Sequence, residues 1–265
     1  MARRKLQHGK CALCGAVGEL TFEHVPPQKA FNNLRTISLS WDEAMRLGPD
    51  APTKGKINQG GVGGYTLCPS CNNGTGAWYA RSLVEWCYRG MEILERSQGR
   101  ADLFHMRACH PLRVFKEIMV MFCSVNPEMT TAQPWLRHFL LNRESREWMD
   151  GWRVFIYYNL EGKLRYAGGA GIINFETGRA TVLSEINYPP FGYVLVMNGE
   201  GAPDERNTEI TQFVKYGFAE TAELIMPLAV LPSHLMYPGD YRTRDEIESA
   251  RKRALAATRD AVDDR

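Results

Sequence analysis

The middle of the chain carries hydrophobic residues at helical spacing. From about Gly76 onward, apolar residues recur every three or four positions, which predicts an amphipathic helix. A second helix is predicted over residues 111–125, because Pro111 is favourable in a first helical turn. This segment is apolar on nearly all sides and should therefore be deeply buried. A third helix is predicted over residues 134–148.

After residue 150 the pattern changes to short runs of β-branched and aromatic residues, separated by Gly, Asn and Pro, which predict strands. These strands cover residues 153–158, 164–167, 171–175, 180–183 and 192–197. Residues 159–162 and 176–178 have the composition of hairpin turns. We therefore expect an antiparallel meander that forms a small barrel or a curved sheet. Residues 211–231 could add two strands, and a charged helix is expected from Arg244.

The N-terminal part has weaker patterning. Residues 20–24 alternate as a strand does, and the Pro-Pro pair after Val25 ends it. A second short strand is predicted at residues 65–67, and a short helix start at Ser40. Residues 55–64 are glycine-rich without periodicity and predict a loop. This loop lacks the Lys-Ser/Thr of a phosphate-binding P-loop, so a hinge or substrate-approach loop is the better interpretation.

These elements predict an α+β protein in three parts. Residues 1–100 form an N-terminal module, residues 101–150 a helical segment packed on it, and residues 151–265 a mostly antiparallel β region with a C-terminal helix. A length of 265 residues fits one large domain or two modest ones. A hydrophobic content of 44% is sufficient for a core.

The net charge of +2 excludes a polycationic protein, but the charge is uneven along the chain. The first thirty-five residues contain a basic excess over Glu19 and Glu23, contributed by Arg3, Arg4, Lys5, Lys10, Lys29 and Arg35. Such an excess favours contact with a phosphate backbone. It is equally compatible with a solubilising tail.

Four of the seven cysteines form two C-x2-C pairs, Cys11/Cys14 and Cys68/Cys71. Two such pairs are the ligand set of a tetrahedral Zn²⁺ site, with disulfides or free thiols as the alternatives. Because the sequence shows no secretory segment and no apolar run that could span a membrane, we expect a cytoplasmic protein without a membrane partner. Paired thiols in that compartment favour a metal. The other three cysteines lie in apolar patterns and are expected to be buried thiols: Cys87, Cys109 and Cys123.

The order of motifs is C-x2-C, a strand that ends in Glu-His, a loop, C-x2-C-Asn and a helix. This order resembles the HNH endonuclease family (His-Me finger) in its zinc-knuckle-stabilised form with a ββα-metal core. The matching residues are Cys11, Cys14, Glu23, His24, Pro26, Cys68, Cys71, Asn72 and Gly76. The resemblance covers residues 9–85, about a third of the chain.

The resemblance implies a role for three side chains. A histidine at a strand end, with an ordinary pKa of about 6.5, suits a general base near neutral pH, and His24 has this position. The family's pattern places Glu23 and Asn72 on a catalytic Mg²⁺ or Mn²⁺ ion, distinct from the structural Zn²⁺. Other interpretations remain: His24 as a structural histidine, Glu23 as a support of the knuckle loop, and Asn72 as a helix cap.

One departure from the family concerns its middle asparagine, which orients the base and usually precedes the second knuckle by a few residues. Here that segment is Gly61-Val-Gly-Gly-Tyr65. Asn58 and Gln59 are the nearest polar substitutes, and neither has the expected offset. The second departure is the final metal position, where asparagine replaces the stronger ligand histidine.

The function expected from the resemblance is metal-dependent hydrolysis of nucleic-acid phosphodiester bonds, with DNA as the expected substrate, in a bacterial or phage defence or restriction system. The first alternative is a zinc-stabilised nucleic-acid-binding module without catalysis. The second is an effector subunit that a partner protein activates. The C-terminal β region could position the substrate, bind a partner protein or mediate a homodimer.

Overall fold

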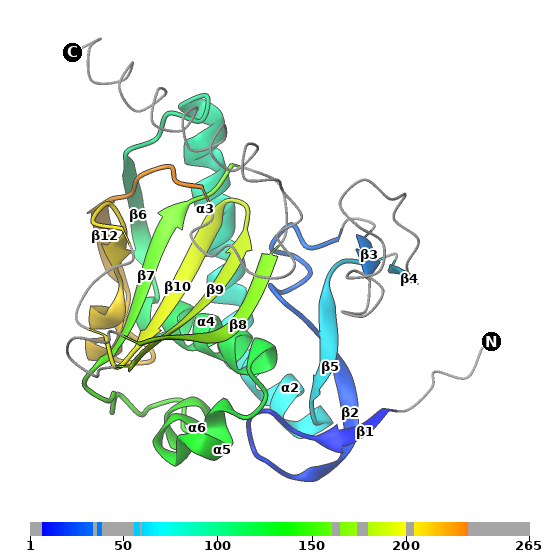
Figure 1. The fold of residues 1–265 in the computed structure, drawn as a ribbon. Helices are drawn as coiled ribbons and strands as arrows, with labels where there is room; N and C mark the ends of the chain where they lie inside the picture. Colours follow the sequence, from blue (N-terminus) through cyan, green and yellow to red (C-terminus); the bar gives the residue numbers. More distant parts are fainter. Residues whose placement is uncertain are drawn as a thin grey trace.

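The computed structural model describes residues 7–33, 36–38, 56–58, 60–160, 165–173, 180–199 and 204–232. Within these ranges the protein has a mixed α+β fold (Figure 1). Its strands form a three-stranded sheet, a five-stranded sheet and two two-stranded ribbons, and every strand pair in them is antiparallel. The α+β class predicted from the pattern is confirmed.

The N-terminal sheet has the order β1-β2-β5. It consists of β1 (Gln7–Lys10), β2 (Val17–His24) and β5 (Gly63–Leu67). Both strands predicted in this region are therefore present, each somewhat longer than the pattern indicated. The loop predicted over residues 55–64 is wrong in part, because β4 (Lys56–Asn58) and the start of β5 lie in it.

Strand β4 pairs with β3 (Thr36–Ser38) in a small separate ribbon. The helix start predicted at Ser40 and the helix predicted from Arg244 lie outside the described residues.

A 28-residue helix follows β5 directly. It begins as α2 (Pro69–Thr75), passes through a π-helical turn, η1 (Gly76–Ala80), and continues as α3 (Arg81–Arg96). The predicted start at Gly76 is wrong, because Pro69 already occupies the first turn. The second cysteine of the second knuckle, Cys71, is thus a helical residue.

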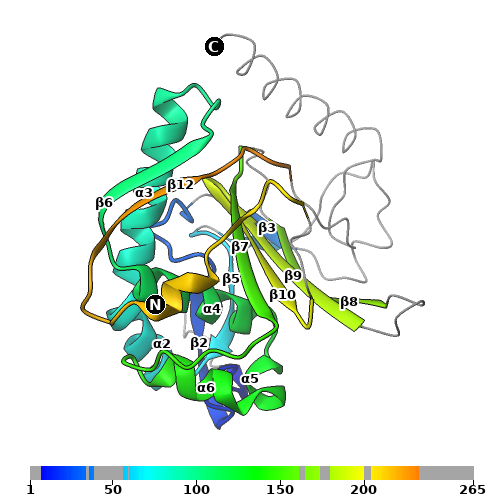
Figure 2. The same ribbon diagram turned by 90° about the vertical axis from the view of Figure 1, so that its left-hand side faces the viewer.

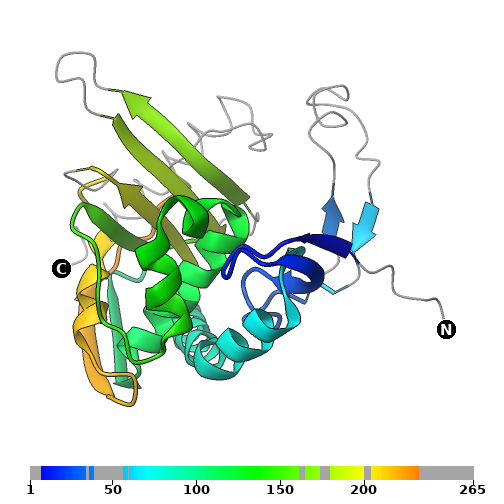
Figure 3. The same ribbon diagram turned by 90° about the horizontal axis from the view of Figure 1, so that it is seen from below.

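Helix α4 (Pro111–Val125) has the predicted bounds and is buried along almost its entire length. It runs between the five-stranded sheet and the N-terminal hairpin (Figures 1 and 3). Toward the hairpin, Thr66 of β5 donates a hydrogen bond to Ser124 of α4 at 3.1 Å. Toward the sheet, Asn126 donates to Ser184 at 3.1 Å. The helix therefore joins the zinc-knuckle region to the β region.

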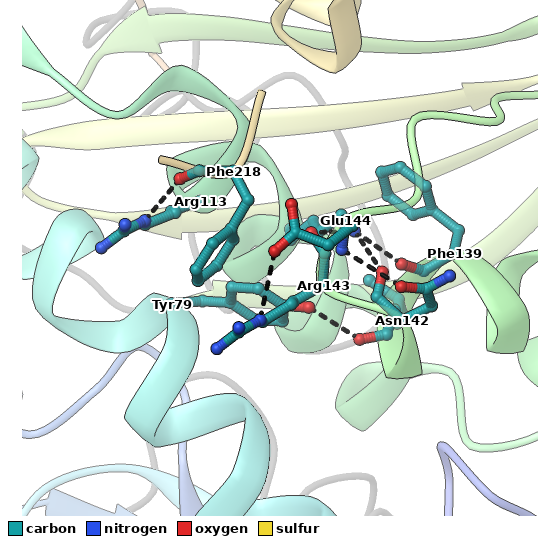
Figure 4. Close-up of polar contacts among 9 residues, drawn as sticks. Tyr79, Arg113, Phe139, Asn142, Arg143, Glu144 and Phe218 are labelled. Atoms are coloured by element: carbon teal, nitrogen blue, oxygen red, sulfur yellow. Dashed lines mark hydrogen bonds and ion pairs between the residues drawn. The ribbon is translucent and has the colours of Figure 1, made fainter. Parts of the chain in front are cut away.

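Two short helices follow, α5 (Met129–Ala132) and α6 (Pro134–Leu141). The predicted third helix is too long, since α6 ends at Leu141 rather than at residue 148. The buried Lys116 ammonium lies at this end and donates to the carbonyls of Phe139, Asn142 and Arg143, at 2.8, 2.8 and 3.1 Å. These carbonyls lie beside Tyr79, whose hydroxyl donates to Leu140 (Figure 4). A cation that satisfies the last carbonyls favours a helix end here.

The five-stranded sheet has the order β11-β7-β10-β9-β8. Its strands are β7 (Trp152–Tyr158), β8 (Arg165–Ile173), β9 (Ala180–Tyr188), β10 (Phe191–Met197) and β11 (Thr208–Glu209). The antiparallel pairing predicted for the strands after residue 150 is confirmed.

Two details of the predicted meander are wrong. Strand β7 pairs with β10 and β11 rather than with β8, so the predicted hairpin between β7 and β8 is not formed, and part of its turn lies outside the described residues. The described parts of the two strands predicted at 164–167 and 171–175 belong to one strand, β8, which carries a register shift between Ala167 and Ala170. Within the described ranges, β11 and β8 are the two edges, so the sheet is open and not a barrel.

A two-stranded ribbon lies along α3 (Figure 2). It pairs β6 (Leu103–Cys109), which the pattern did not predict, with β12 (Ala222–Pro227). Of the two strands expected within residues 211–231, only β12 forms. The other position is occupied by the 3₁₀ helix η2 (Thr211–Lys215).

One hydrophobic core contains residues from all three predicted parts. At its centre the Trp86 ring lies 4.2 Å from Phe104 and 5.6 Å from Phe191, measured between ring centroids. The division at residues 100 and 150 remains a prediction. None of the helices in the described ranges is both long and apolar enough to cross a membrane.

Candidate functional site

The two cysteine pairs meet in one cluster. The sulfur atoms of Cys11, Cys14, Cys68 and Cys71 all lie within 4.8 Å of one another. The Sγ atoms of Cys14 and Cys68 are 3.8 Å apart. A tetrahedral zinc ion with Zn–S bonds of about 2.3 Å has sulfur–sulfur edges of about 3.8 Å. The four thiols therefore fit a structural Zn²⁺ ion, as the spacing predicted.

Local backbone structure directs these sulfurs toward one point. Gly15, at φ +74°, lets the first knuckle turn back so that its amide donates to the Cys11 carbonyl at 2.9 Å. The Ala12 amide donates to the Thr66 carbonyl at 2.9 Å, which ties the first knuckle to the strand before the second. The Cys68 amide then donates to Cys11 Sγ at 3.3 Å.

The protonation of the thiols also fits metal binding. The hydrogen bond from Cys71 lowers the pKa of Cys11 to about 4, and the same contact raises the pKa of Cys71. Burial raises the pKa of Cys14. One thiolate is thus stabilised by its neighbours, and a cation would stabilise the others, since zinc binds the deprotonated form.

The imidazole of His24 lies at the end of β2 and is half-buried. Its ring packs edge-on against Phe22, with centroids 4.9 Å apart. The Nε2 atom lies 3.0 Å from the Gly60 carbonyl oxygen. A carbonyl can only accept, so Nε2 carries the proton and Nδ1 is the basic nitrogen. The contact therefore leaves Nδ1 as the ring nitrogen available for another partner.

The backbone opposite His24 approaches it closely at two glycines. Gly63 pairs with His24 across the sheet, and a Cβ atom there would lie 1.8 Å from the Glu23 carbonyl oxygen. Gly61 has a φ of +104°, which glycine adopts readily and other residues rarely do. The glycine-rich segment thus has a definite shape, which carries the Gly60 carbonyl to the imidazole.

The residue that holds this segment is Asn32, which sequence reasoning missed. Its side chain is fully buried. Its Nδ2 donates to the carbonyls of Pro26 and Val62, and its Oδ1 accepts from the Val62 amide, each at 2.7 Å. Asn58, proposed as a substitute for the middle asparagine, lies in the β3–β4 ribbon, and Gln59 lies outside the described residues. No sequence signal identifies Asn32, because its partner is thirty residues away in the chain.

Asn72 lies inside α2, whose N-cap is Cys68, so its interpretation as a helix cap is wrong. Its Nδ2 donates to Thr21 Oγ1 at 3.0 Å and to the Phe22 carbonyl at 3.3 Å. Both bonds use the amide nitrogen, which keeps the Oδ1 oxygen for a further partner. Asn72 is thus brought against the strand that carries Glu23 and His24.

Glu23 points to the other face of β2 from His24, because successive strand residues alternate. Its side chain is 7% exposed, and burial raises its pKa to about 7. A second buried carboxyl, Glu117 of α4, lies near it: burial raises the pKa of Glu117 well above its ordinary value, and the charge of Glu23 raises it further. Glu117 was not identified from the sequence, because a single acidic residue within a predicted buried helix gives no signal of a site.

The remaining candidates have structural surroundings. The thiols of Cys87, Cys109 and Cys123 are buried, as predicted. The ring of His105 binds the Glu223 carboxylate at 2.8 Å, far along the chain from the cysteine cluster.

Comparison of the chain with protein-family models, with curated proteins and with solved structures found no match.

Proposed function

We propose that the protein is a metal-dependent endonuclease of the HNH type that hydrolyses phosphodiester bonds, with DNA as its substrate. In this proposal His24 is the general base, Glu23 and Asn72 hold a catalytic Mg²⁺ or Mn²⁺ ion, and Zn²⁺ on the four cysteines is structural. The proposal rests on the site's own geometry together with the order of motifs in the sequence.

The observation that carries the proposal is the hydrogen bond between His24 Nε2 and the Gly60 carbonyl, 3.0 Å long. It fixes the tautomer in which Nδ1 can accept a proton from water. The carbonyl is itself held, since Asn32 binds both backbone groups of Val62, two residues further on. A base with a preset tautomer and orientation is what proton abstraction at neutral pH requires.

Binding of the catalytic Mg²⁺ or Mn²⁺ ion requires oxygen ligands. Glu23 supplies a carboxylate and Asn72 an amide oxygen, both types that Mg²⁺ and Mn²⁺ accept. When bound, such an ion stabilises negative charge on the phosphate and on the leaving oxygen. The Asn72 contacts with Thr21 and Phe22 support this role, because they bring α2 against the catalytic strand.

Binding of the substrate requires basic side chains that can contact its phosphates. Lys29 is exposed and follows His24 by only five positions. Such a cationic side chain would contact phosphates irrespective of base sequence. Lys10, in β1, lies opposite Val17 at the far end of β2 from His24 and pairs with Glu128 at 2.7 Å, so it is not next to the imidazole.

A plasmid-nicking assay with Mg²⁺ or Mn²⁺ tests the proposal. His24→Ala is expected to reduce the cleavage rate by about 10²- to 10⁴-fold, the usual contribution of a general base. His138→Ala is the matched control, because His138 is an exposed histidine of α6. DNA affinity should be the same in both variants and in the parent.

Equal cleavage by His24→Ala and the parent would refute the assignment of the base. If the parent binds DNA but cleaves it under none of the metal conditions, the protein is instead a zinc-stabilised nucleic-acid-binding module. The burial of Glu23 is the observation that favours this second candidate, since a catalytic metal needs access to its carboxylate.

A further inference from the structure

Glu117 is a buried acidic residue whose Oε2 atom has no hydrogen-bond partner among the described residues. Its side chain is 2% exposed. Within the described part of the chain, neither Glu117 nor Glu23 has an ion-pair partner. Buried carboxylates are costly unless they are paired with cations or bound to a metal. A bound cation would therefore stabilise both carboxyls in their charged form.

The packing of α4 explains how Glu117 reaches the catalytic strand. Residues seven apart lie on the same face of a helix, so Glu117 shares its face with Ser124. Ser124 accepts a hydrogen bond from Thr66 of β5 at 3.1 Å. This face of α4 therefore packs against the N-terminal hairpin. Glu117 lies about two helical turns before the contact made by Ser124.

The hairpin presents Glu23 to the same face of α4. Gly64 lies directly opposite Glu23 in the β2–β5 pairing, and Thr66 is two residues after Gly64. The pairing shifts register at Thr66, but a Cβ atom built on Gly64 would lie 3.4 Å from Thr66 Cγ2, so Thr66 projects from the side of Gly64. Cross-strand neighbours share a face, and Glu23 therefore projects from this side of the hairpin as well. The effect of the Glu23 charge on the pKa of Glu117 agrees with this placement.

From this arrangement we propose that Glu117 is a ligand of the divalent cation, together with Glu23 and Asn72, so that α4 contributes to a metal site built otherwise from the β2–α2 unit. The inference rests on the proposed function for the role of Glu23 and Asn72. It adds a ligand from outside the zinc-knuckle motif. A cation there would neutralise the two buried carboxylates and occupy the unpaired Oε2 atom.

Titration of the zinc-loaded full-length protein with Mn²⁺, followed by calorimetry and by the electron paramagnetic resonance of free Mn²⁺, tests the inference. Glu117→Gln should weaken Mn²⁺ binding by at least about tenfold, the lower bound for loss of even an outer-shell partner. Without Mn²⁺ the same variant should melt at a higher temperature than the parent, because one buried carboxylate is removed. Glu85→Gln is the control, since Glu85 is an acidic residue on the surface of α3.

The outcomes separate this inference from the proposed nuclease function. The role of Glu117 is refuted if Glu117→Gln binds Mn²⁺ as tightly as the parent, or if the parent does not bind Mn²⁺. The plasmid-cleavage assay then tests the proposed nuclease function independently. Mn²⁺ binding that depends on Glu117 in a parent that does not cleave DNA supports the metal site and refutes the nuclease. His24→Ala should retain Mn²⁺ binding in every case, because the imidazole is not a ligand in this arrangement.

Discussion

Asn32 holds the backbone of Val62 from both sides: its Oδ1 accepts from the Val62 amide, and its Nδ2 donates to the Val62 carbonyl, both at 2.7 Å. The Val62 carbonyl also accepts a hydrogen bond from the Val25 amide at 3.1 Å, next to the end of β2 that carries His24. The asparagine thus connects the chain after His24 to the chain before β5. It positions the segment beside His24 through backbone contacts.

Replacing Asn32 tests this role. Asn32→Ala leaves the Pro26 carbonyl without its side-chain donor and the Val62 amide without its acceptor, and should cost about 1–3 kcal/mol of unfolding free energy per unsatisfied group. In the NMR spectrum, the His24 ring should lose its fixed tautomer. Urea unfolding and histidine ¹⁵N shifts measure the two effects. Asn73→Ala is the control, because Asn73 is exposed; a normal His24 signal in Asn32→Ala would contradict the positioning role.

Gly63 provides a second test of the loop geometry. A Cβ atom at this position would overlap the Glu23 carbonyl oxygen, 1.8 Å away, so Gly63→Ala must separate β5 from β2 at His24. We expect loss of stability and of metal-dependent cleavage together. Gly18→Ala is a matched control within β2, since nothing lies within 4 Å of its Cβ position. Thermal melting of both variants provides the comparison, and equal melting temperatures would show that the close approach does not exist in solution.

Removal of zinc should affect the N-terminal part first. Metal analysis is expected to find one Zn²⁺ per chain, and a strong chelator should lower the melting temperature, because the metal joins the first knuckle to the start of α2. Cys14→Ala should lose the zinc. Cys123→Ala should keep it, since Cys123 is a buried thiol of α4 and not part of the cluster. Full zinc content in Cys14→Ala would exclude the four-thiol site.

The pH dependence of stability should reveal the burial of Glu23. Its pKa rises from 4.5 to about 7 in the folded protein, so the folded state binds the proton more tightly than the unfolded state. In zinc-loaded protein without added Mg²⁺ or Mn²⁺, the stabilisation is complete below about pH 4.5 and is lost as the pH rises through about 7. Denaturant titrations across this window should show a smaller decline for Glu23→Gln. An identical decline in that variant would mean that Glu23 is not buried in solution.

Local pattern was sufficient for the elements whose signal is contained in their own residues. The bounds of α4 followed from its largely apolar residues after Pro111, and the zinc cluster followed from the spacing of the two cysteine pairs. The long helix was placed correctly, but its start was not, because Cys71 and Asn72 were read as loop residues. The spacing of the thiols predicts a metal site, and the periodicity of apolar residues predicts a helix, without knowledge of distant segments.

Strand partners and helix ends depended on contacts with distant segments. In the five-stranded sheet β7 pairs with β10, which lies far along the chain, and alternation within a strand does not specify its neighbour. Helix α6 ends where Lys116, more than twenty positions earlier, donates to its last carbonyls. The residue that favours the end of α6 is thus located in another helix, α4.

The sequence alone determined that four thiols could bind a metal and that a histidine follows an acidic residue at a strand end. Only the tertiary structure decided which ring nitrogen of His24 faces the Gly60 carbonyl, which asparagine holds that segment, and that Glu117 of α4 is near enough to Glu23 for the charge of Glu23 to raise its pKa. The physical reason is that thiol spacing encodes a short-range geometry, whereas hydrogen bonds and buried charges are set by whichever segments the packed core brings together.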